Sequence, residues 1–140
     1  MKKLLALCLL LTILSASLLT SCSFNNYNPI ALKYQNSDYA PYTDGEAKIF
    51  LVDLLNNSKW HKTIAKCDCD YTVMMKNQRE ISYHSECGTF IDYDLDKSLT
   101  VSEEDRVKLN GYLVGVMCEG NVHFLDENNR CIVCGFEMTE

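Results

Sequence analysis

The chain has 140 residues and a formal net charge of −6, with 19 acidic side chains against 13 lysines and arginines. This length suits a single domain, and an acidic chain lacks the basic surface that binds nucleic acid. The same balance offers no basic patch to lipid headgroups, so charge alone would not hold the protein at a membrane surface.

The first 21 residues have the pattern of an export signal. Lys2 and Lys3 precede an almost wholly apolar run from Leu4 to Leu19. Because this run is short and polar sequence follows it, a secretory signal peptide is favoured over a membrane-spanning helix. The run ends at residues 19–22 in an aliphatic residue, two small residues and Cys22, a pattern that resembles the lipobox of bacterial lipoproteins.

The resemblance to bacterial lipoproteins implies that Cys22 is the first residue of the mature protein. In that family the cysteine thiol is alkylated by a diacylglycerol, a peptidase cuts before the cysteine, and the new amine can be acylated too. Two acyl chains give stable anchoring. Removal of residues 1–21 leaves 119 residues and takes two lysines away, so the net charge moves from −6 to −8. We therefore expect a lipid-anchored protein on the extracytoplasmic face of the cell membrane, with the bilayer as partner of acylated Cys22.

The mature chain divides into a tether at residues 22–42 and one domain at residues 43–140. Residues 23–42 have no apolar period and contain several asparagines and both prolines, which is typical of a flexible tether. Residues 43–58 are predicted to form a helix, because Thr43 and Glu46 fit a capping box and apolar side chains recur at helical spacing.

Alternating apolar side chains predict a β-hairpin from residues 67–75 and 80–87. A three-residue loop at 77–79 places the apolar sets on one face and pairs Met75 with Ile81. The same register pairs Cys69 with Cys87 across the strands, at a distance suited to a disulfide.

The remaining sequence predicts a third strand at 89–95, a second helix, and short strands at 116–118, 121–125 and 130–136. Thr100 or Ser102 caps this helix, which extends to about Val114, and Gly115 ends it. The expected fold is α+β: a small antiparallel meander with two helices and a C-terminal hairpin that carries cysteines.

An even number of cysteines outside the cytoplasm favours disulfide bonds, although fifteen pairings of six cysteines exist. The six candidates are Cys67, Cys69, Cys87, Cys118, Cys131 and Cys134. Alternatively, the CxxC motif at Cys131 and Cys134 resembles half of a zinc ribbon or a metal knuckle, and Cys118 and His123 would complete a tetrahedral site. The same motif is also found in thiol–disulfide oxidoreductases.

Residues 92–103 resemble an EF-hand calcium loop. The oxygen ligands would come from Asp92, Asp94, Asp96, Ser98, Thr100 and Glu103. Lys97 replaces the glycine of the sharp turn, however, and the preceding segment is expected to be a strand. The alternative is an acidic strand end that leads into a capped helix with a favourable helix dipole.

No spacing of catalytic residues stands out along the chain. We therefore predict a non-catalytic, lipid-anchored binding or interaction module without a cofactor, whose partner is an unidentified protein or small molecule. The alternatives are a metal-binding domain, with calcium at residues 92–103 or zinc at the C-terminal cysteines, and a redox enzyme that uses Cys131 and Cys134.

Overall fold

The computed structural model describes residues 26–42 and 45–138. The predicted signal peptide, Cys22 and the predicted cap residue Thr43 lie outside the described residues. Within the described part, no helix combines the length and the apolar character needed to cross a bilayer.

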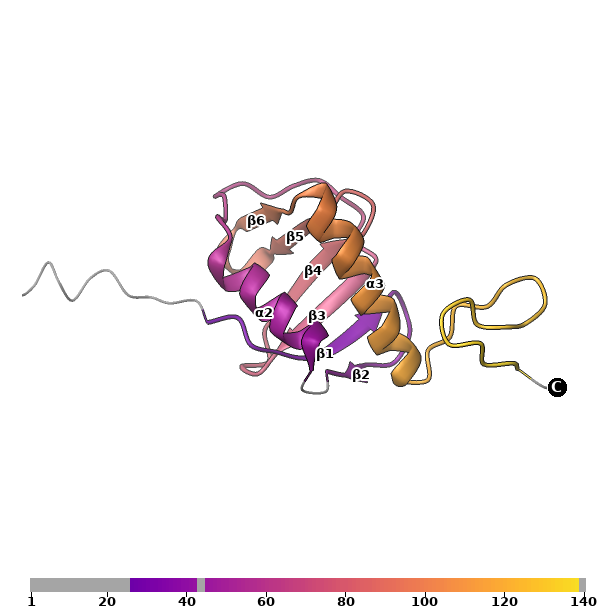
Figure 1. Cartoon of the computed structure of the whole chain (residues 1–140). Coiled ribbons are helices and arrows are strands. Elements are labelled where there is room, and N and C mark those ends of the chain that lie inside the picture. The colour runs from indigo at the N-terminus through magenta and orange to yellow at the C-terminus, as the bar shows by residue number, and fades with distance from the viewer. Residues whose placement is uncertain (1–25, 43–44, 139–140) are drawn as a thin grey trace, which may run out of the picture.

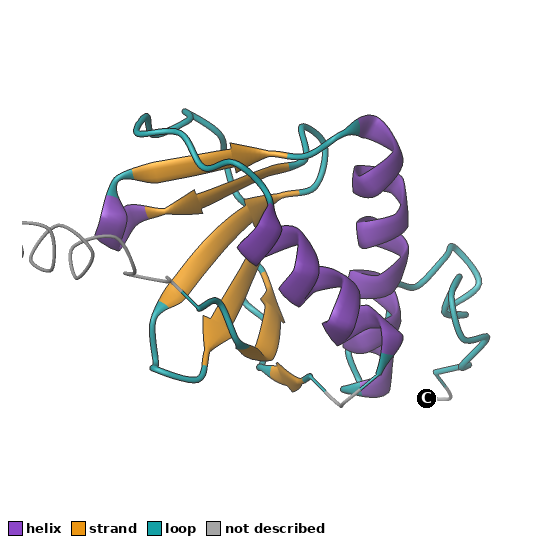
Figure 2. Ribbon diagram, turned by 60° about the vertical axis from the view of Figure 1, so that its left-hand side comes forward, coloured by secondary structure: helices purple, strands orange, loops and turns teal. Residues whose placement is uncertain are grey.

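Six antiparallel strands form one sheet in the order β2-β1-β3-β4-β5-β6. The strands are β1 (Pro29–Tyr34), β2 (Ala40–Pro41), β3 (Tyr71–Met75), β4 (Glu80–His84), β5 (Thr89–Asp92) and β6 (Lys97–Thr100). Helices α2 (Glu46–Asn57) and α3 (Glu103–Glu119) cover one face of the sheet, and the short 3-10 helix η1 (Tyr93–Leu95) links β5 to β6 (Figure 1). The predicted α+β class is confirmed, and Figure 2 shows the sheet and the helices as two layers.

The core lies between the sheet and the two helices. In β3 the buried positions alternate with half-buried ones, as expected for a strand with one face against a core. Leu51 and Leu55 of α2 and Leu109 and Leu113 of α3 are fully buried against this face. Burial of one apolar stripe on each helix, rather than intrinsic helix propensity, therefore holds both helices in place.

The position of strand β1 shows that the predicted boundary between tether and domain, at residue 43, lies too late in the chain. It lies inside the sheet between β2 and β3, although residues 22–42 were expected to be a tether. Tyr27 and Leu32 are almost completely buried in the core. The folded part therefore begins before residue 43. The sequence did not indicate this, because the two buried apolar side chains are too widely spaced to show a period among the polar residues.

The hairpin of β3 and β4 forms as predicted, but in a different register. Val73 lies opposite Ile81, and Tyr71 lies opposite Tyr83. The turn uses residues 76–78, with Gln78 in the left-handed region at φ 65°. The predicted pairing of Met75 with Ile81 is wrong by two residues, a shift that keeps every side chain on the same face.

Helix α3 begins as predicted and ends later. The Ser102 side chain accepts a hydrogen bond from the backbone N–H of Asp105 at 3.1 Å and so caps the helix. The helix continues through Gly115 to Glu119, so the predicted strand at 116–118 is wrong. Burial of Met117 and its neighbours stabilises this extension of the helix by more than the ~1 kcal/mol that a glycine inside a helix costs. The two predicted strands beyond are reduced to isolated bridges, Leu125 with Cys131 and residue 130 with 137.

Candidate metal centre

Four side chains meet where the C-terminal segment folds back on the end of α3: Cys118, His123, Cys131 and Cys134. Their ligand atoms all lie within 4.8 Å of one another. The Sγ atoms of Cys118 and Cys131 are 3.4 Å apart, and Cys134 Sγ is 3.4 Å from His123 Nδ1. Two sulfurs that share a tetrahedral zinc ion lie about 3.8 Å apart, whereas a disulfide bond measures about 2.05 Å. The spacing is thus much closer to that of two ligands of one ion.

The backbone of the CxxC turn supports a thiolate at Cys131. Hydrogen bonds from the backbone N–H of Cys134, and then from that of Val133, lower the pKa of Cys131 to about 5. Gly135 adopts the left-handed conformation at φ 73°, and its N–H donates to the Cys131 carbonyl at 2.9 Å. Since metals bind the thiolate and not the thiol, the turn presents Cys131 in the form that a metal requires.

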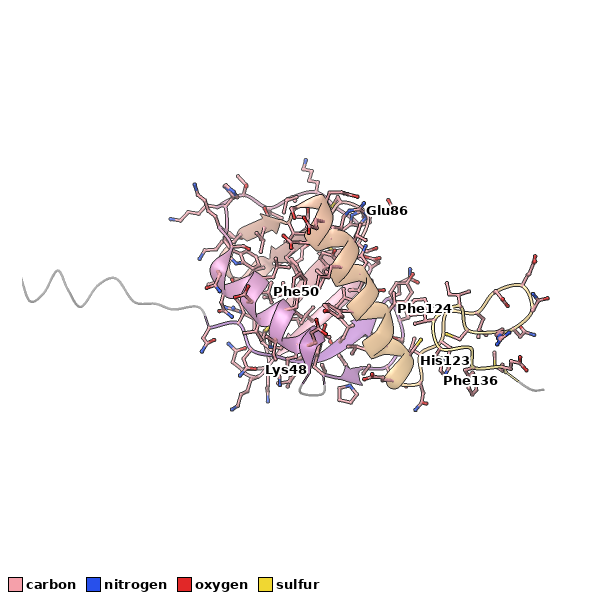
Figure 3. All side chains as sticks on the ribbon, in the orientation of Figure 1. Lys48, Phe50, Glu86, His123, Phe124 and Phe136 are labelled. Carbon is pink, nitrogen blue, oxygen red and sulfur yellow. The ribbon has the colours of Figure 1, made fainter. Side chains whose placement is uncertain are left out.

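The other ligands are held by the fold on either side. Cys118 lies in the last turn of α3, where burial and the neighbouring Cys131 thiol raise its pKa to about 12. The His123 ring stacks on Phe136 with ring centroids 4.3 Å apart, and Figure 3 shows both rings in the C-terminal segment. Phe124 packs edge-on against Tyr34 of β1 at 5.2 Å, which attaches the segment to the sheet.

A second cluster consists of Cys67, His84 and Cys87, whose ligand atoms also lie within 4.8 Å of one another. Cys87 Sγ is 3.3 Å from Cys67 Sγ and 2.9 Å from His84 Nδ1. Burial alone would raise the pKa of Cys87, but contacts from Thr89, Cys67 and His84 lower it. Sequence reasoning missed this cluster, although His84 and Cys87 are three residues apart, a spacing that suits two ligands in one turn.

The predicted disulfides are not present among the described residues. All six cysteines after Cys22 are free. Cys87 was expected to pair with Cys69, but its nearest sulfur belongs to Cys67. The reason is that Cys67 and Cys69 lie in an irregular loop before β3, where strand alternation does not apply.

The structure does not gather the residues of the predicted calcium loop. Asp92 is fully buried in β5, where its Oδ2 accepts a hydrogen bond from the Tyr27 hydroxyl at 3.0 Å and lies 3.4 Å from Arg79 Nη2. Two further predicted ligands, Ser98 and Thr100, lie in strand β6, and Glu103 bonds to Arg106 at the start of α3. Among the described residues, the groups of side chains close enough to share a metal are the two cysteine–histidine clusters.

No family model, no curated protein and no solved structure matches this chain. Its function is therefore inferred from the geometry of its own residues.

Proposed function

We propose that the protein is a lipid-anchored zinc-binding module in which one Zn²⁺ folds residues 120–138, here called the zinc lobe. The observation that carries this proposal is the convergence of Cys118, His123, Cys131 and Cys134 to within 4.8 Å. Three thiolates and one imidazole are a common donor set of structural zinc sites. Two of these residues share one turn, while the other two come from α3 and the loop after it.

A structural and non-catalytic role is supported by the number of ligands. Four protein ligands complete the tetrahedral shell of zinc, which leaves no position for a substrate. The lobe also has little core of its own. Ile132 is 72% exposed, and Phe136 and Met138 are about half exposed. A segment that buries so little apolar surface needs a metal or a comparable cross-link to hold its shape.

The exposed apolar side chains of the zinc lobe support a role of this module in binding or interaction with a partner.

A thiol–disulfide enzyme is less well supported. Such an enzyme needs an accessible first thiol at the start of a helix, whereas Cys131 is 2% exposed and follows an irregular loop. The low pKa of Cys131 is equally suited to a zinc ligand.

The zinc proposal is tested by elemental analysis and intact mass of the mature full-length chain. We expect that Cys131→Ser removes one equivalent of zinc and makes the lobe sensitive to protease, while β3 and the rest of the sheet stay protected. Cys69→Ser is the matched control, because it removes a thiol that belongs to neither cluster. An unchanged zinc content in the Cys131→Ser variant, or a Cys118–Cys131 disulfide in the isolated protein, would refute the proposal.

The anchor is a separate part of the proposal and has its own test. We expect metabolic labelling with a radioactive fatty acid to modify the protein and the protein to sediment with membranes. Cys22→Ala should abolish both, whereas Cys69→Ala should not. Unchanged labelling of the Cys22→Ala variant would refute lipidation at this residue.

A further inference from the structure

The cluster of Cys67, His84 and Cys87 has no place in the zinc lobe. We propose that these three side chains form a second zinc site, which keeps its fourth coordination position open and therefore exchanges its metal faster than the lobe does. This inference concerns different residues from the proposed structural site and stands or falls separately from it.

The turn that carries two of the ligands is held rigidly. His84 is the last residue of β4, and Cys87 lies in the turn that leads to β5. The carboxylate of Asp70 accepts hydrogen bonds from the N–H of Ser85, at 2.8 Å, and from its hydroxyl. A ligand pair on a fixed turn loses little freedom when a metal binds, which favours affinity.

Helix α3 fixes the same turn from the other side. Asn110 donates to the Ser85 carbonyl at 3.0 Å, and Arg106 donates to it at 3.3 Å. Gly88 closes the turn in the left-handed conformation at φ 64°, and an added Cβ there would lie 3.1 Å from the Arg106 side chain. The turn is therefore built into the fold and is not a free surface loop.

The donor atoms match zinc in kind and in spacing. The two sulfurs lie 3.3 Å apart, and the imidazole nitrogen lies 2.9 Å from the Cys87 sulfur. Both distances are shorter than those between two ligands of one zinc ion, where a sulfur and a nitrogen lie about 3.6 Å apart. His84 Nδ1 accepts a hydrogen bond from the Cys87 N–H at 3.3 Å. Because this nitrogen has one lone pair, zinc would take the place of this hydrogen bond. A small outward movement of the side chains admits the ion.

The fourth position is open because the nearest further thiol is directed elsewhere. The Cys69 thiol lies 3.8 Å from the Cys67 carbonyl oxygen, and its sulfur does not belong to the group of atoms within 4.8 Å. Cys87 is exposed. Zinc with three protein ligands keeps a water at the fourth position, and an incoming chelator can replace that water.

The two sites are far enough apart to be tested independently. Arg106 and Asn110 hold the second cluster near the start of α3, whereas Cys118 lies in its last turn. Cys118 follows Arg106 by twelve positions, a rise of about 18 Å along the helix. Figure 3 shows this separation, with Glu86 of the turn near one end of α3 and His123 beyond the other.

Zinc content and zinc release measure the proposal directly. The mature full-length chain is loaded with zinc under reducing conditions, freed of excess metal and mixed with a chromophoric zinc chelator in stopped flow. We expect about two zinc ions per chain, released in a fast and a slow phase of equal size. Cys87→Ser should remove the fast phase, Cys118→Ser the slow phase, and Cys69→Ser neither.

Each outcome decides between the alternatives. A single equivalent that Cys87→Ser does not change would overturn the second site and leave the zinc lobe intact. Loss of the fast phase in Cys69→Ser would overturn the open position, since it would make Cys69 the fourth ligand. A Cys67–Cys87 disulfide that reforms on removal of the reductant, in protein loaded with zinc, would also overturn the proposal. Circular dichroism of each variant confirms that the fold is retained.

Discussion

Asp92 offers a sharp test of the structure, because the two roles assigned to it predict different behaviour. As the first ligand of a calcium loop, its carboxylate would contribute to stability only when calcium is bound. In the structure it is instead a fully buried carboxylate between the Tyr27 hydroxyl and Arg79, whose guanidinium also lies 5.1 Å from the centre of the Tyr27 ring. The substitution Asp92→Asn keeps the shape of the side chain and removes its charge.

Loss of one partner from a buried ion pair costs about 3–5 kcal/mol. Arg79 keeps 14% of its side-chain surface exposed, and the asparagine oxygen still accepts a bond from Tyr27. We therefore expect the lower end, about 3 kcal/mol, which corresponds to a melting temperature lower by roughly 10–15 °C. Asp94→Asn, at an exposed position two residues away, should change stability by less than about 0.5 kcal/mol.

Urea unfolding with tryptophan fluorescence is a suitable assay, because Trp60 is the single tryptophan and stacks on Tyr27 with ring centroids 4.9 Å apart. The loss in Asp92→Asn should be the same in excess calcium and in excess chelator. A loss of less than about 1 kcal/mol, or an effect that appears only when calcium is present, would rule out the buried ion pair at Asp92.

Three further substitutions test the packing of α3, each by the urea midpoint. Gly115→Ala, at a helical position with no atom within 4 Å of an added Cβ, should stabilise the protein by about 0.5–1 kcal/mol; a loss would show that the helix does not continue through this residue. Gly120→Ala should destabilise it by about 1–3 kcal/mol, because the new Cβ would overlap that of Ala40 in β2; a neutral result would contradict the docking of β2 on the helix end. Tyr83→Phe removes a hydroxyl that donates to Asn110 at 2.9 Å and should cost about 1 kcal/mol; no change would mean that water replaces the bond.

The class of fold and the two helices could be predicted from the sequence, because each helix carries an apolar stripe and strands β3 and β4 alternate. Ser102 was correctly one of two predicted caps, since its hydroxyl and the acidic residues after it suit a helix start. Strand β1 was not predictable in this way. Its place inside the sheet depends on long-range pairing with β3, and its residues show no alternation of buried and exposed positions.

The two clusters differ in how close together their residues lie along the sequence. Cys131, Cys134 and Gly135 form a recognisable motif, so the sequence indicated that Cys118 and His123 could complete a metal site, although disulfides were favoured. Cys67 reaches Cys87 only because an irregular loop brings it there. The hairpin pattern permits two registers that differ by two residues, and neither specifies the path of that loop. The spacing of His84 and Cys87 could have indicated two of the three ligands, but the approach of Cys67 could not be predicted.

In the lipid-anchored protein that we propose, the early start of the fold sets the distance between the folded part and the bilayer. Tyr27 is buried and lies only five residues after Cys22, and an extended chain of that length reaches at most about 18 Å. With Cys22 as the proposed lipid anchor, the connecting segment is short and the folded part would lie close to the headgroups. The zinc lobe (yellow) and the start of the described chain (indigo) lie on opposite sides of the molecule (Figure 1). With the proposed anchor at Cys22, the lobe would be the part of the described chain farthest from the membrane, and its apolar side chains would face an approaching partner.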